Sequence, residues 1–292
     1  MLWGSCEAWP AFRRVASKGV YAGGGSIAEG GLRRKRLGRK GLKAFSIKKH
    51  IVTIGVCRNV GSGSVQSSCG SCFTKGTDMK LLFSRNPNPR LAVATARYLK
   101  ADVTFEFASP MAPGAADVYR MLNPNLTLPI LVGSGWSLWE TDAIACRLSR
   151  DVGSDFWRGG DDQPDMIRWV SWGKERFAYA CDMVHFERGT KQRYGLGPID
   201  QALVEEGFRQ FHRAAAILEP ELAGRDWLVG TSISYADFRM ATFLPFNDAA
   251  GLPLDDYPSI RRWYGRLEAI DAWRDPFQGL QAPQLPPIKV EA

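Results

Sequence analysis

The spacing of apolar residues becomes regular only from Met79 onward. Apolar runs at 80–84 and 103–107 predict two strands, and the alanine-rich stretch 89–100 between them predicts a helix. The remaining elements expected in this part are a helix at 115–122, strands at 130–132 and 136–138, and a helix at 140–150. This order predicts an α/β domain over residues 79–152, with a small mixed sheet flanked by helices.

Beyond a Gly/Asp-rich linker at 151–163, every apolar pattern has the helical period. Pro164 is expected to begin a helix with apolar positions that include Ile167 and Phe177. Further helices are expected at 199–223, 234–248 and 258–270. The pattern predicts an all-α domain over residues 163–280, and the proline-rich residues 281–292 are expected to be a tail.

Residues 1–78 have a different composition from the rest. They hold 14 of the 38 Lys and Arg residues but only 3 of the 30 Asp and Glu residues, and no sustained period. The prediction is a disordered basic extension. Three interpretations stay open: a nucleic-acid-binding or targeting tail, an organelle transit segment, or sequence upstream of a true start at Met79.

The overall composition is that of a globular protein, with 45% hydrophobic and 23% charged residues. No apolar run is long enough for a membrane span. The net charge of +8 comes from residues 1–78, so nucleic-acid binding through the basic run at 33–49 is only a third hypothesis.

Cys146 and Cys181 do not form a disulfide framework, which favours a reducing cytoplasm. Cys69-Gly-Ser-Cys72 has dithiol spacing, but it precedes the first strand, which favours a loop.

Three segments carry a family signal. The first joins Asn123-Pro-Asn-Leu-Thr-Leu128-Pro129-Ile-Leu to Leu138-Trp-Glu140-Thr141-Asp-Ala-Ile. The second runs from Trp227-Leu-Val-Gly230 to Ser234-Tyr-Ala-Asp237, and the third is Tyr257-Pro-Ser-Ile-Arg-Arg-Trp263. In this order they resemble the glutathione S-transferase superfamily over about residues 79–280. The resemblance implies a thioredoxin-like glutathione-binding domain followed by a helical domain, matching the fold class predicted from periodicity.

The resemblance also implies where glutathione binds. A cis Leu128-Pro129 bond would present the backbone of Leu128 to the cysteinyl part of the peptide, and Glu140 with Thr141 would hold its γ-glutamyl end at a helix start. From the residues alone, two alternatives stay open: Pro129 as an ordinary turn proline, and Thr141 or Asp142 as a plain helix cap. Thr127 stands where relatives often have Lys, which leaves Arg90 and Arg120 as candidates for the glycyl carboxylate, or as solvated surface residues.

The position that activates the thiol departs from the family. Asn86-Pro87-Asn88-Pro89-Arg90 aligns with a turn that usually begins with Ser or Cys, so the candidate catalytic residues are Asn86, Ser84 and Asn88. The two prolines remove backbone donors there, and Asn86 or Asn88 is also an ordinary N-cap. The turn is similar to that of the elongation factor gamma subunit, which acts as an interaction module.

The expected function is therefore transfer of the glutathione thiolate to an electrophilic small molecule, as a cytoplasmic homodimer in detoxification. Glutathione is the expected co-substrate, with no metal, because His185 and His212 have no partner at ligand spacing. Aromatic residues and His185 on the first helix of the second domain are expected either to line a pocket or to form core: Trp169, Trp172, Phe177 and Tyr179. The alternative function is a non-catalytic scaffold. Ser234 and Asp237 are expected to form a capping pair.

Overall fold

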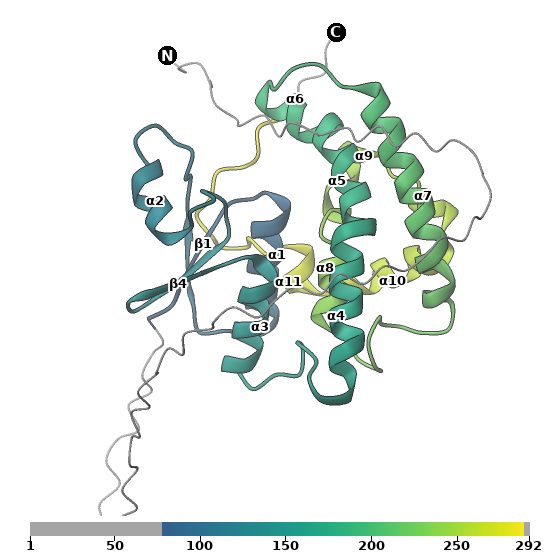
Figure 1. Ribbon diagram of the computed structural model, residues 1–292, viewed down its shortest axis with the longest axis horizontal. Coiled ribbons are helices and arrows are strands. Elements are labelled where there is room, and N and C mark those ends of the chain that lie inside the picture. Colours follow the sequence, from purple (N-terminus) through teal and green to yellow (C-terminus); the bar gives the residue numbers. More distant parts are fainter. Residues whose placement is uncertain (1–77, 289–292) are drawn as a thin grey trace, which may run out of the picture. The chain divides into compact units, whose positions relative to one another are not determined.

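The computed structural model describes residues 78–288. The features predicted within residues 1–77, including the basic run and the Cys69–Cys72 pair, lie outside the described residues. The described residues belong to one compact unit. Its sheet elements come first along the chain and its helical elements follow (Figure 1). The domain boundaries at 152 and 163 stay predictions.

The sheet has four strands in the order β2-β1-β3-β4. Their bounds are β1 Lys80–Phe83, β2 Thr104–Phe107, β3 Ile130–Gly133 and β4 Trp136–Trp139. Strands β1 and β2 are parallel, whereas β3 is antiparallel to both β1 and β4. The predicted mixed sheet is confirmed.

Alternation along β1 assigns the two faces of the sheet. Leu81 and Phe83 pack with α1 (Pro87–Tyr98) and α3 (Thr141–Asp151) on one face. Leu82 points the other way and packs near α2 (Ala116–Leu122). Both faces are covered because successive side chains of a strand alternate in direction. Figure 1 shows α2 on the opposite side of the sheet from α1 and α3.

Helix α1 begins two residues earlier than predicted. Pro87 and Pro89 occupy its first turn, where a backbone N–H has no intrahelical partner and its absence carries no penalty. Helix α3 begins one residue later than predicted, because Glu140 adopts a left-handed φ of 72° that is outside the helical region.

The helical part begins with one long helical segment. Its pieces are η1 Gly160–Asp162, α4 Gln163–Trp172, a π-helical stretch Gly173–Ala178, α5 Tyr179–His185, a second π stretch Phe186–Thr190, and α6 Lys191–Tyr194. The later elements are α7 Gln201–Ala223, α8 Tyr235–Met240, η4 Leu244–Phe246, α9 Asn247–Ala250, η5 Leu254–Asp256, α10 Pro258–Glu268 and α11 Asp271–Arg274. Each π turn rotates the helix face, so one 3.6-residue pattern does not extend along the segment. Ile167, expected to be apolar core, is 51% exposed.

The prediction of a single helix over residues 234–248 was wrong, because the observed helix α8 is much shorter. Helix α8 stops at Met240, where the Thr242 hydroxyl donates to the Arg239 carbonyl at 2.6 Å and replaces the helical ladder. Pro245 then starts a short 3-10 turn. Helix α7 starts at Gln201 rather than 199 because the Asp200 carboxylate accepts from the backbone N–H groups of Ala202 and Leu203.

The predicted capping pair lies in the core. The Asp237 carboxylate is fully buried and accepts from the backbone N–H of Ser234 at 2.9 Å and from its hydroxyl at 3.0 Å. It also accepts from Leu228 N at 2.9 Å and Trp263 Nε1 at 3.0 Å. One polar residue therefore ties the start of α8 to the preceding loop and to α10. No helix within residues 78–288 is long and apolar enough to cross a membrane.

Candidate functional site

Strand register brings three candidate segments to one edge of the sheet. Leu82 of β1 pairs with Ile130 of β3, and Ile130 pairs with Trp139 of β4. The residues just beyond these pairs are Ser84 after β1, Pro129 before β3 and Glu140 after β4. Since the pairs are neighbours across the sheet, the three flanking segments meet at the same edge.

The loop before β3 is held by a buried amide. Asn123 is 1% exposed, and its Nδ2 donates to the Thr127 carbonyl at 2.8 Å and to the Thr127 hydroxyl oxygen at 3.1 Å. Its Oδ1 accepts from Asn125 N at 3.0 Å. The Leu128–Pro129 bond that follows is cis. Within the described residues, the N–H and C=O of Leu128 make no hydrogen bond to another group.

Helix α3 presents a regular helix N-terminus at this edge. The amides of its first turn have no intrahelical acceptor, and the first backbone bond runs from Ile144 N to the Glu140 carbonyl at 3.0 Å. The Thr141 hydroxyl is buried and donates to the Asn88 carbonyl at 3.3 Å. The Glu140 carboxylate lies 3.6 Å from Lys174 Nζ. The start of α3 therefore offers backbone donors together with one solvent-accessible carboxylate.

Helix α1 presents a poorer N-terminus. Pro87 and Pro89 leave Asn88 as the only residue among its first three with an N–H. Asn86 is exposed and its side chain makes no capping hydrogen bond, and its carbonyl accepts from Arg90 N at 2.9 Å. Ser84 is partly buried. Of the two capping interpretations for Asn86 and Asn88, the structure shows neither side chain capping α1.

Asn88 instead belongs to a network that sequence reasoning missed. Its Oδ1 accepts from Arg239 Nη1 at 2.7 Å, and Arg239 Nε lies 3.2 Å from Asp142 Oδ1. The same Asp142 oxygen accepts from the Tyr235 hydroxyl at 2.6 Å. Burial, together with Asp142, raises the pKa of Tyr235 well above 10, so Tyr235 stays a donor. The starts of α1, α3 and α8 are joined through this network, and Asp142 does not cap α3.

The two arginine candidates for the glycyl carboxylate lie in different environments. Arg120 is exposed on α2. Arg90 is 7% exposed, donates to the Trp273 carbonyl, and places its guanidinium 4.9 Å from the centre of the Trp273 ring. Burial lowers the pKa of Arg90 to about 10. The expectation of a solvated surface role was therefore wrong for Arg90.

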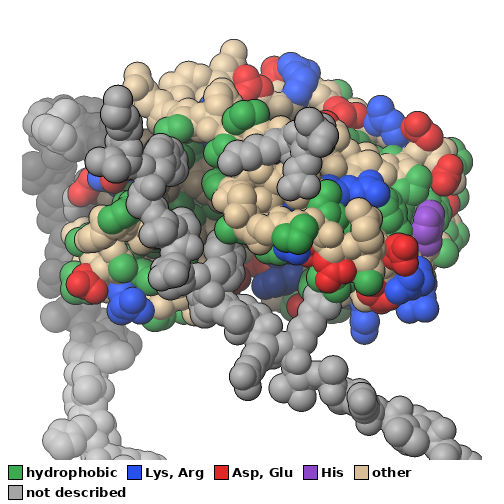
Figure 2. All heavy atoms as spheres, turned by 90° about the horizontal axis from the view of Figure 1, so that it is seen from above, with side chains coloured by type: hydrophobic (Ala, Val, Ile, Leu, Met, Phe, Trp, Pro, Cys, Tyr) green, Lys and Arg blue, Asp and Glu red, His purple; other side chains and the backbone are tan. Residues whose placement is uncertain are grey.

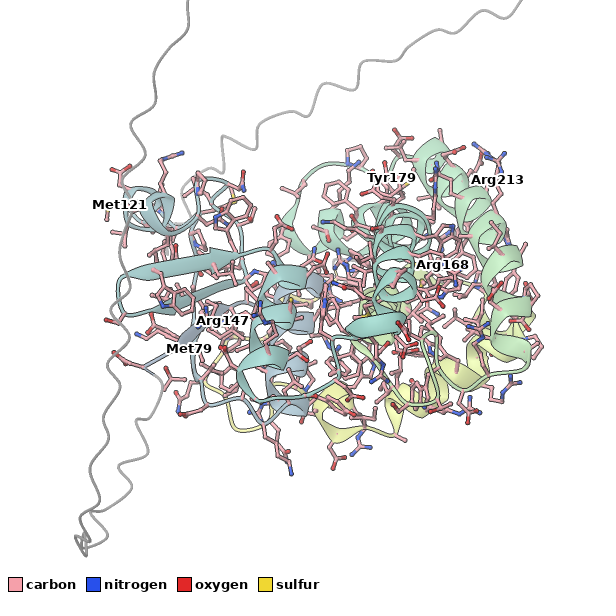
Figure 3. All side chains as sticks on the ribbon, turned by 60° about the horizontal axis from the view of Figure 1, so that its bottom comes forward. Met79, Met121, Arg147, Arg168, Tyr179 and Arg213 are labelled. Atoms are coloured by element: carbon pink, nitrogen blue, oxygen red, sulfur yellow. The ribbon has the colours of Figure 1, made fainter. Side chains whose placement is uncertain are left out.

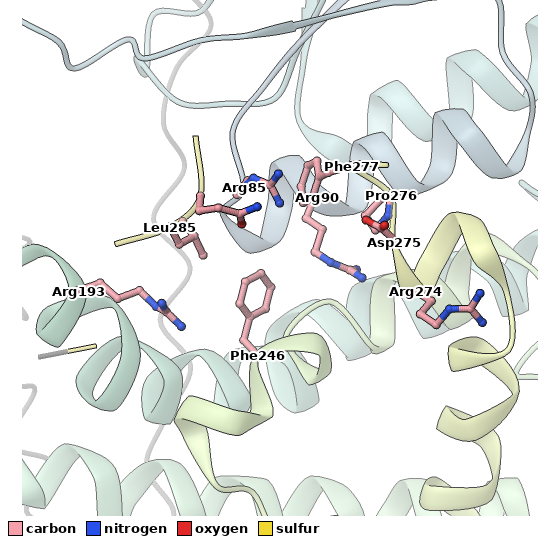
Figure 4. A pocket seen from close by; sticks show the side chains of 10 residues that line it. Arg85, Arg90, Arg193, Phe246, Arg274, Asp275, Pro276, Phe277 and Leu285 are labelled. Atoms are coloured by element: carbon pink, nitrogen blue, oxygen red, sulfur yellow. The ribbon is translucent and has the colours of Figure 1, made fainter. Parts of the chain in front are cut away.

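A cavity of about 320 Å³ adjoins the start of α1 (Figure 4). It lies between the β1–α1 loop, α6, η4 and the segment after α11. Its lining residues are Arg85, Arg90, Arg193, Phe246, Arg274, Asp275, Pro276, Phe277, Gln284 and Leu285. Arg85 directly precedes Asn86, so one wall of this cavity continues into the position proposed for thiol activation.

The aromatic residues of the first long helix are divided between core and surface. Trp169 and Phe177 are buried in the helical core, and His185 is 4% exposed beside Phe246. Tyr179 is exposed on the outside of the helical part (Figure 3). For the buried members, the core alternative is confirmed. No group of three potential metal-ligating side chains occurs within residues 78–288.

Comparison with known proteins agrees with this geometry. Residues 181–271 match the family model of the glutathione S-transferase C-terminal domain. Glutathione transferase F7 from Populus trichocarpa has 16% identity, covers 70% of this chain and 99% of its own, and has a TM-score of 0.62. Human glutathione S-transferase T1-1 has 19% identity, coverages of 68% and 88%, and a TM-score of 0.62. Ure2p in complex with glutathione has 20% identity, coverages of 70% and 100%, and a TM-score of 0.59.

The described residues thus have the glutathione S-transferase fold, with a mixed four-stranded sheet followed by a helical part. Residues 181–271 match the C-terminal domain model of this family, and the described residues as a whole are similar in fold to glutathione S-transferases.

Proposed function

We propose that the protein binds glutathione at the sheet edge formed by Leu128, Pro129, Glu140 and Thr141, and transfers its thiolate to an electrophilic small molecule. The observation that carries this proposal is the meeting of a cis-proline loop with unpaired Leu128 backbone groups and the N-terminus of α3. The Leu128 N–H and C=O would pair with the cysteinyl residue as a strand does. The α3 amides would receive the γ-glutamyl carboxylate, and Glu140 its ammonium group.

The chemical step follows from where the cysteinyl sulfur would lie. The thiol loses its proton to solvent near the start of α1, and the thiolate attacks an electrophilic carbon, whose leaving group departs with the bonding electrons. Asn86 supplies an exposed amide that can donate to the thiolate, and Asn88 N is the remaining backbone donor of the first turn. Ser84, two residues earlier, is the other candidate donor.

Glutathione binding to the full chain is tested by calorimetry, followed by ultraviolet absorbance of bound thiolate against pH. The proposal expects binding at millimolar glutathione and a thiol pKa below that of free glutathione. Thr141→Val should weaken binding by ~10-fold, because it removes the hydroxyl that joins the start of α3 to the Asn88 carbonyl and so positions the α3 amides. Thr104→Val is the matched control, since its hydroxyl makes a bond of the same length, 3.3 Å to the Met79 carbonyl, at the opposite end of β1. Absence of binding at millimolar glutathione contradicts the proposal.

A non-catalytic scaffold is the second candidate function. It is favoured by the exposed Asn86, which has neither hydroxyl nor thiol. It is also favoured by Pro87 and Pro89, which remove two backbone N–H donors from the first turn of α1. Turnover of several electrophiles by the wild type and by Asn86→Ser separates the two. Strong wild-type turnover excludes the scaffold, whereas turnover that appears only in Asn86→Ser supports it.

We also propose that the protein is a cytoplasmic homodimer with a role in detoxification. The support for a protein contact is the exposure of single apolar side chains: Met121 on α2 is 85% exposed (Figure 3), and Ile167 on α4 is 51% exposed. Sedimentation equilibrium of the full chain tests the dimer, and a monomer at micromolar concentration overturns it.

A further inference from the structure

The cavity beside the start of α1 has an unbalanced charge. Four arginines line it, Arg85, Arg90, Arg193 and Arg274, against one carboxylate, Asp275. Elsewhere Lys and Arg are mixed with Asp and Glu, as Figure 2 shows for one face of the molecule. A concentration of one sign inside a concave site raises the local potential for ligands of the opposite sign.

Three of these arginines form no ion pair with a carboxylate within the described residues, although Asp275 lies near enough to Arg90 to oppose the lowering of its pKa. Arg85 lies 4.6 Å from the Phe277 ring, Arg90 donates to the Trp273 carbonyl, and Arg193 donates to the Pro286 carbonyl at 2.8 Å. Arg274 differs, because it pairs with Asp271. Buried charges are normally paired, and Arg90 is more than nine-tenths buried.

Unused donors remain at the same place. The Nε atoms of Arg85 and Arg193 are buried and make no hydrogen bond. In Figure 4 the side chains of Arg193 and Arg90 extend from opposite sides toward the space beside Phe246, whereas Arg274 points away. Guanidinium groups recognise carboxylate, sulfonate and phosphate by paired N–H donors.

The uncharged part of the lining is mostly apolar, with Gln284 as its one polar side chain. Phe246, Phe277 and Leu285 supply two rings and a branched side chain. The volume of about 320 Å³ is at the lower end of small-molecule sites. The lining therefore fits a ligand of about one ring that carries an anionic group.

We propose that this cavity binds a small aromatic carboxylate or sulfonate, with its anionic group between Arg85, Arg90 and Arg193 and its ring against Phe246 and Phe277. Because Arg85 directly precedes Asn86, a ligand here lies next to the start of α1. If the proposed function holds, on which this last step rests, the preferred electrophile is an anionic aromatic compound.

Calorimetry on the full chain, without glutathione, compares 3,5-dinitrobenzoate with the neutral 3,5-dinitrobenzamide. The benzoate should bind at least ~10-fold more tightly, and added salt should reduce the difference. Arg85→Gln/Arg193→Gln should abolish the preference, whereas Arg85→Lys/Arg193→Lys should retain part of it. Arg213→Gln, an exposed arginine of α7 (Figure 3), removes one charge outside the cavity and should keep the full preference. Circular dichroism confirms that each variant is folded.

Equal affinity for the two probes overturns the inference, as does a preference that survives in the folded double Gln variant. Loss of glutathione binding in that variant, with displacement of the benzoate by glutathione, also overturns it, because the arginines would then serve glutathione itself. Benzoate binding without any glutathione binding supports the inference and contradicts the proposed function. Glutathione binding without a preference for the benzoate supports the proposed function and overturns the inference about the cavity.

Discussion

Asp237 shows how one buried side chain can stabilise several segments. Asp237→Ala leaves donors on Leu228, Ser234 and Trp263 buried without an acceptor. The free energy of unfolding should fall by about 3 to 5 kcal/mol, the range for breaking a buried charged network. Urea denaturation at neutral pH measures this change.

Asp255→Ala is the matched control for that prediction. Its side chain is 98% exposed and lies 3.9 Å from Arg261. Removing a solvent-screened pair of this kind should change the free energy of unfolding by less than about 0.5 kcal/mol. Equal losses in the two variants would contradict the special role of Asp237.

His185 predicts a pH dependence of stability. Burial next to Phe243 and Phe246, with Arg193 nearby, lowers its pKa from 6.5 to about 4, while Asp248 opposes the shift. Between these values the unfolded chain binds a proton that the folded chain does not. Stability from this residue is therefore complete above pH 6.5 and falls as the pH decreases toward 4. The full loss is about 3 kcal/mol, at 1.36 kcal/mol per unit of pKa.

Urea unfolding of wild type and His185→Leu across this pH range tests the assignment. The variant should show a flatter decrease in the free energy of unfolding at acidic pH, because leucine does not titrate. Val184→Ala, a buried neighbour without a charge, should lower stability equally at every pH and keep the wild-type slope. An unchanged slope in His185→Leu would show that other groups cause the acid sensitivity.

At the scale of elements, Gly207 determines how closely α5 and α7 approach. A Cβ atom at Gly207 would lie 2.7 Å from Val184 Cγ2 and 3.1 Å from Met183 Cβ, both on α5. Gly207→Val should destabilise the protein by about 1 to 3 kcal/mol or more, because the two helices must separate.

Gly265→Ala in α10 is the control, since nothing lies within 4 Å of its added Cβ. That variant should be neutral or gain up to about 1 kcal/mol from helix propensity. Thermal unfolding of both variants measures the difference, and a similar melting temperature in both would refute close packing at Gly207.

The sheet part could be predicted from sequence because its elements have local causes. Short apolar runs predict β1 to β4, and prolines or turn residues bound them. The helical part was predicted less accurately, because two π stretches rotate the apolar face and the Thr242 hydroxyl ends α8 early. Neither feature can be recognised from a 3.6-residue pattern of apolar positions.

The candidate site divides in the same way. The cis Leu128–Pro129 bond was implied by the family resemblance of a contiguous motif, and the start of α3 was predicted to within one residue. The network of Asp142 with Tyr235 and Arg239 could not be predicted from the sequence, since it joins residues about a hundred positions apart that share no periodicity. The burial of Arg90 was also missed, because it depends on Trp273 at the far end of the chain.

For the described molecule as a whole, the segment after α11 links the sheet part to the helical part. The Phe277 ring stacks on Phe83 of β1 with centroids 5.7 Å apart, and Arg97 of α1 donates to the Gln278 carbonyl at 2.5 Å. Further along, the Pro286 carbonyl accepts from Arg193 of α6. Residues of this segment line the arginine-lined cavity, so it contributes both to stability and to the proposed ligand site.

Phe277→Ala should therefore weaken the sheet part selectively. The residue is 8% exposed and packs against Phe83. The truncation leaves a cavity and should lower the free energy of unfolding by about 3 to 5 kcal/mol. Hydrogen exchange of the Leu81 and Leu82 amides should accelerate more than that of Phe211 in α7, because the lost contacts belong to the sheet side. Gln281→Ala, an exposed position in the same segment, should leave every rate unchanged. If β1 and α7 lose protection equally in Phe277→Ala, the two parts unfold as one unit and the segment stabilises both through that single transition.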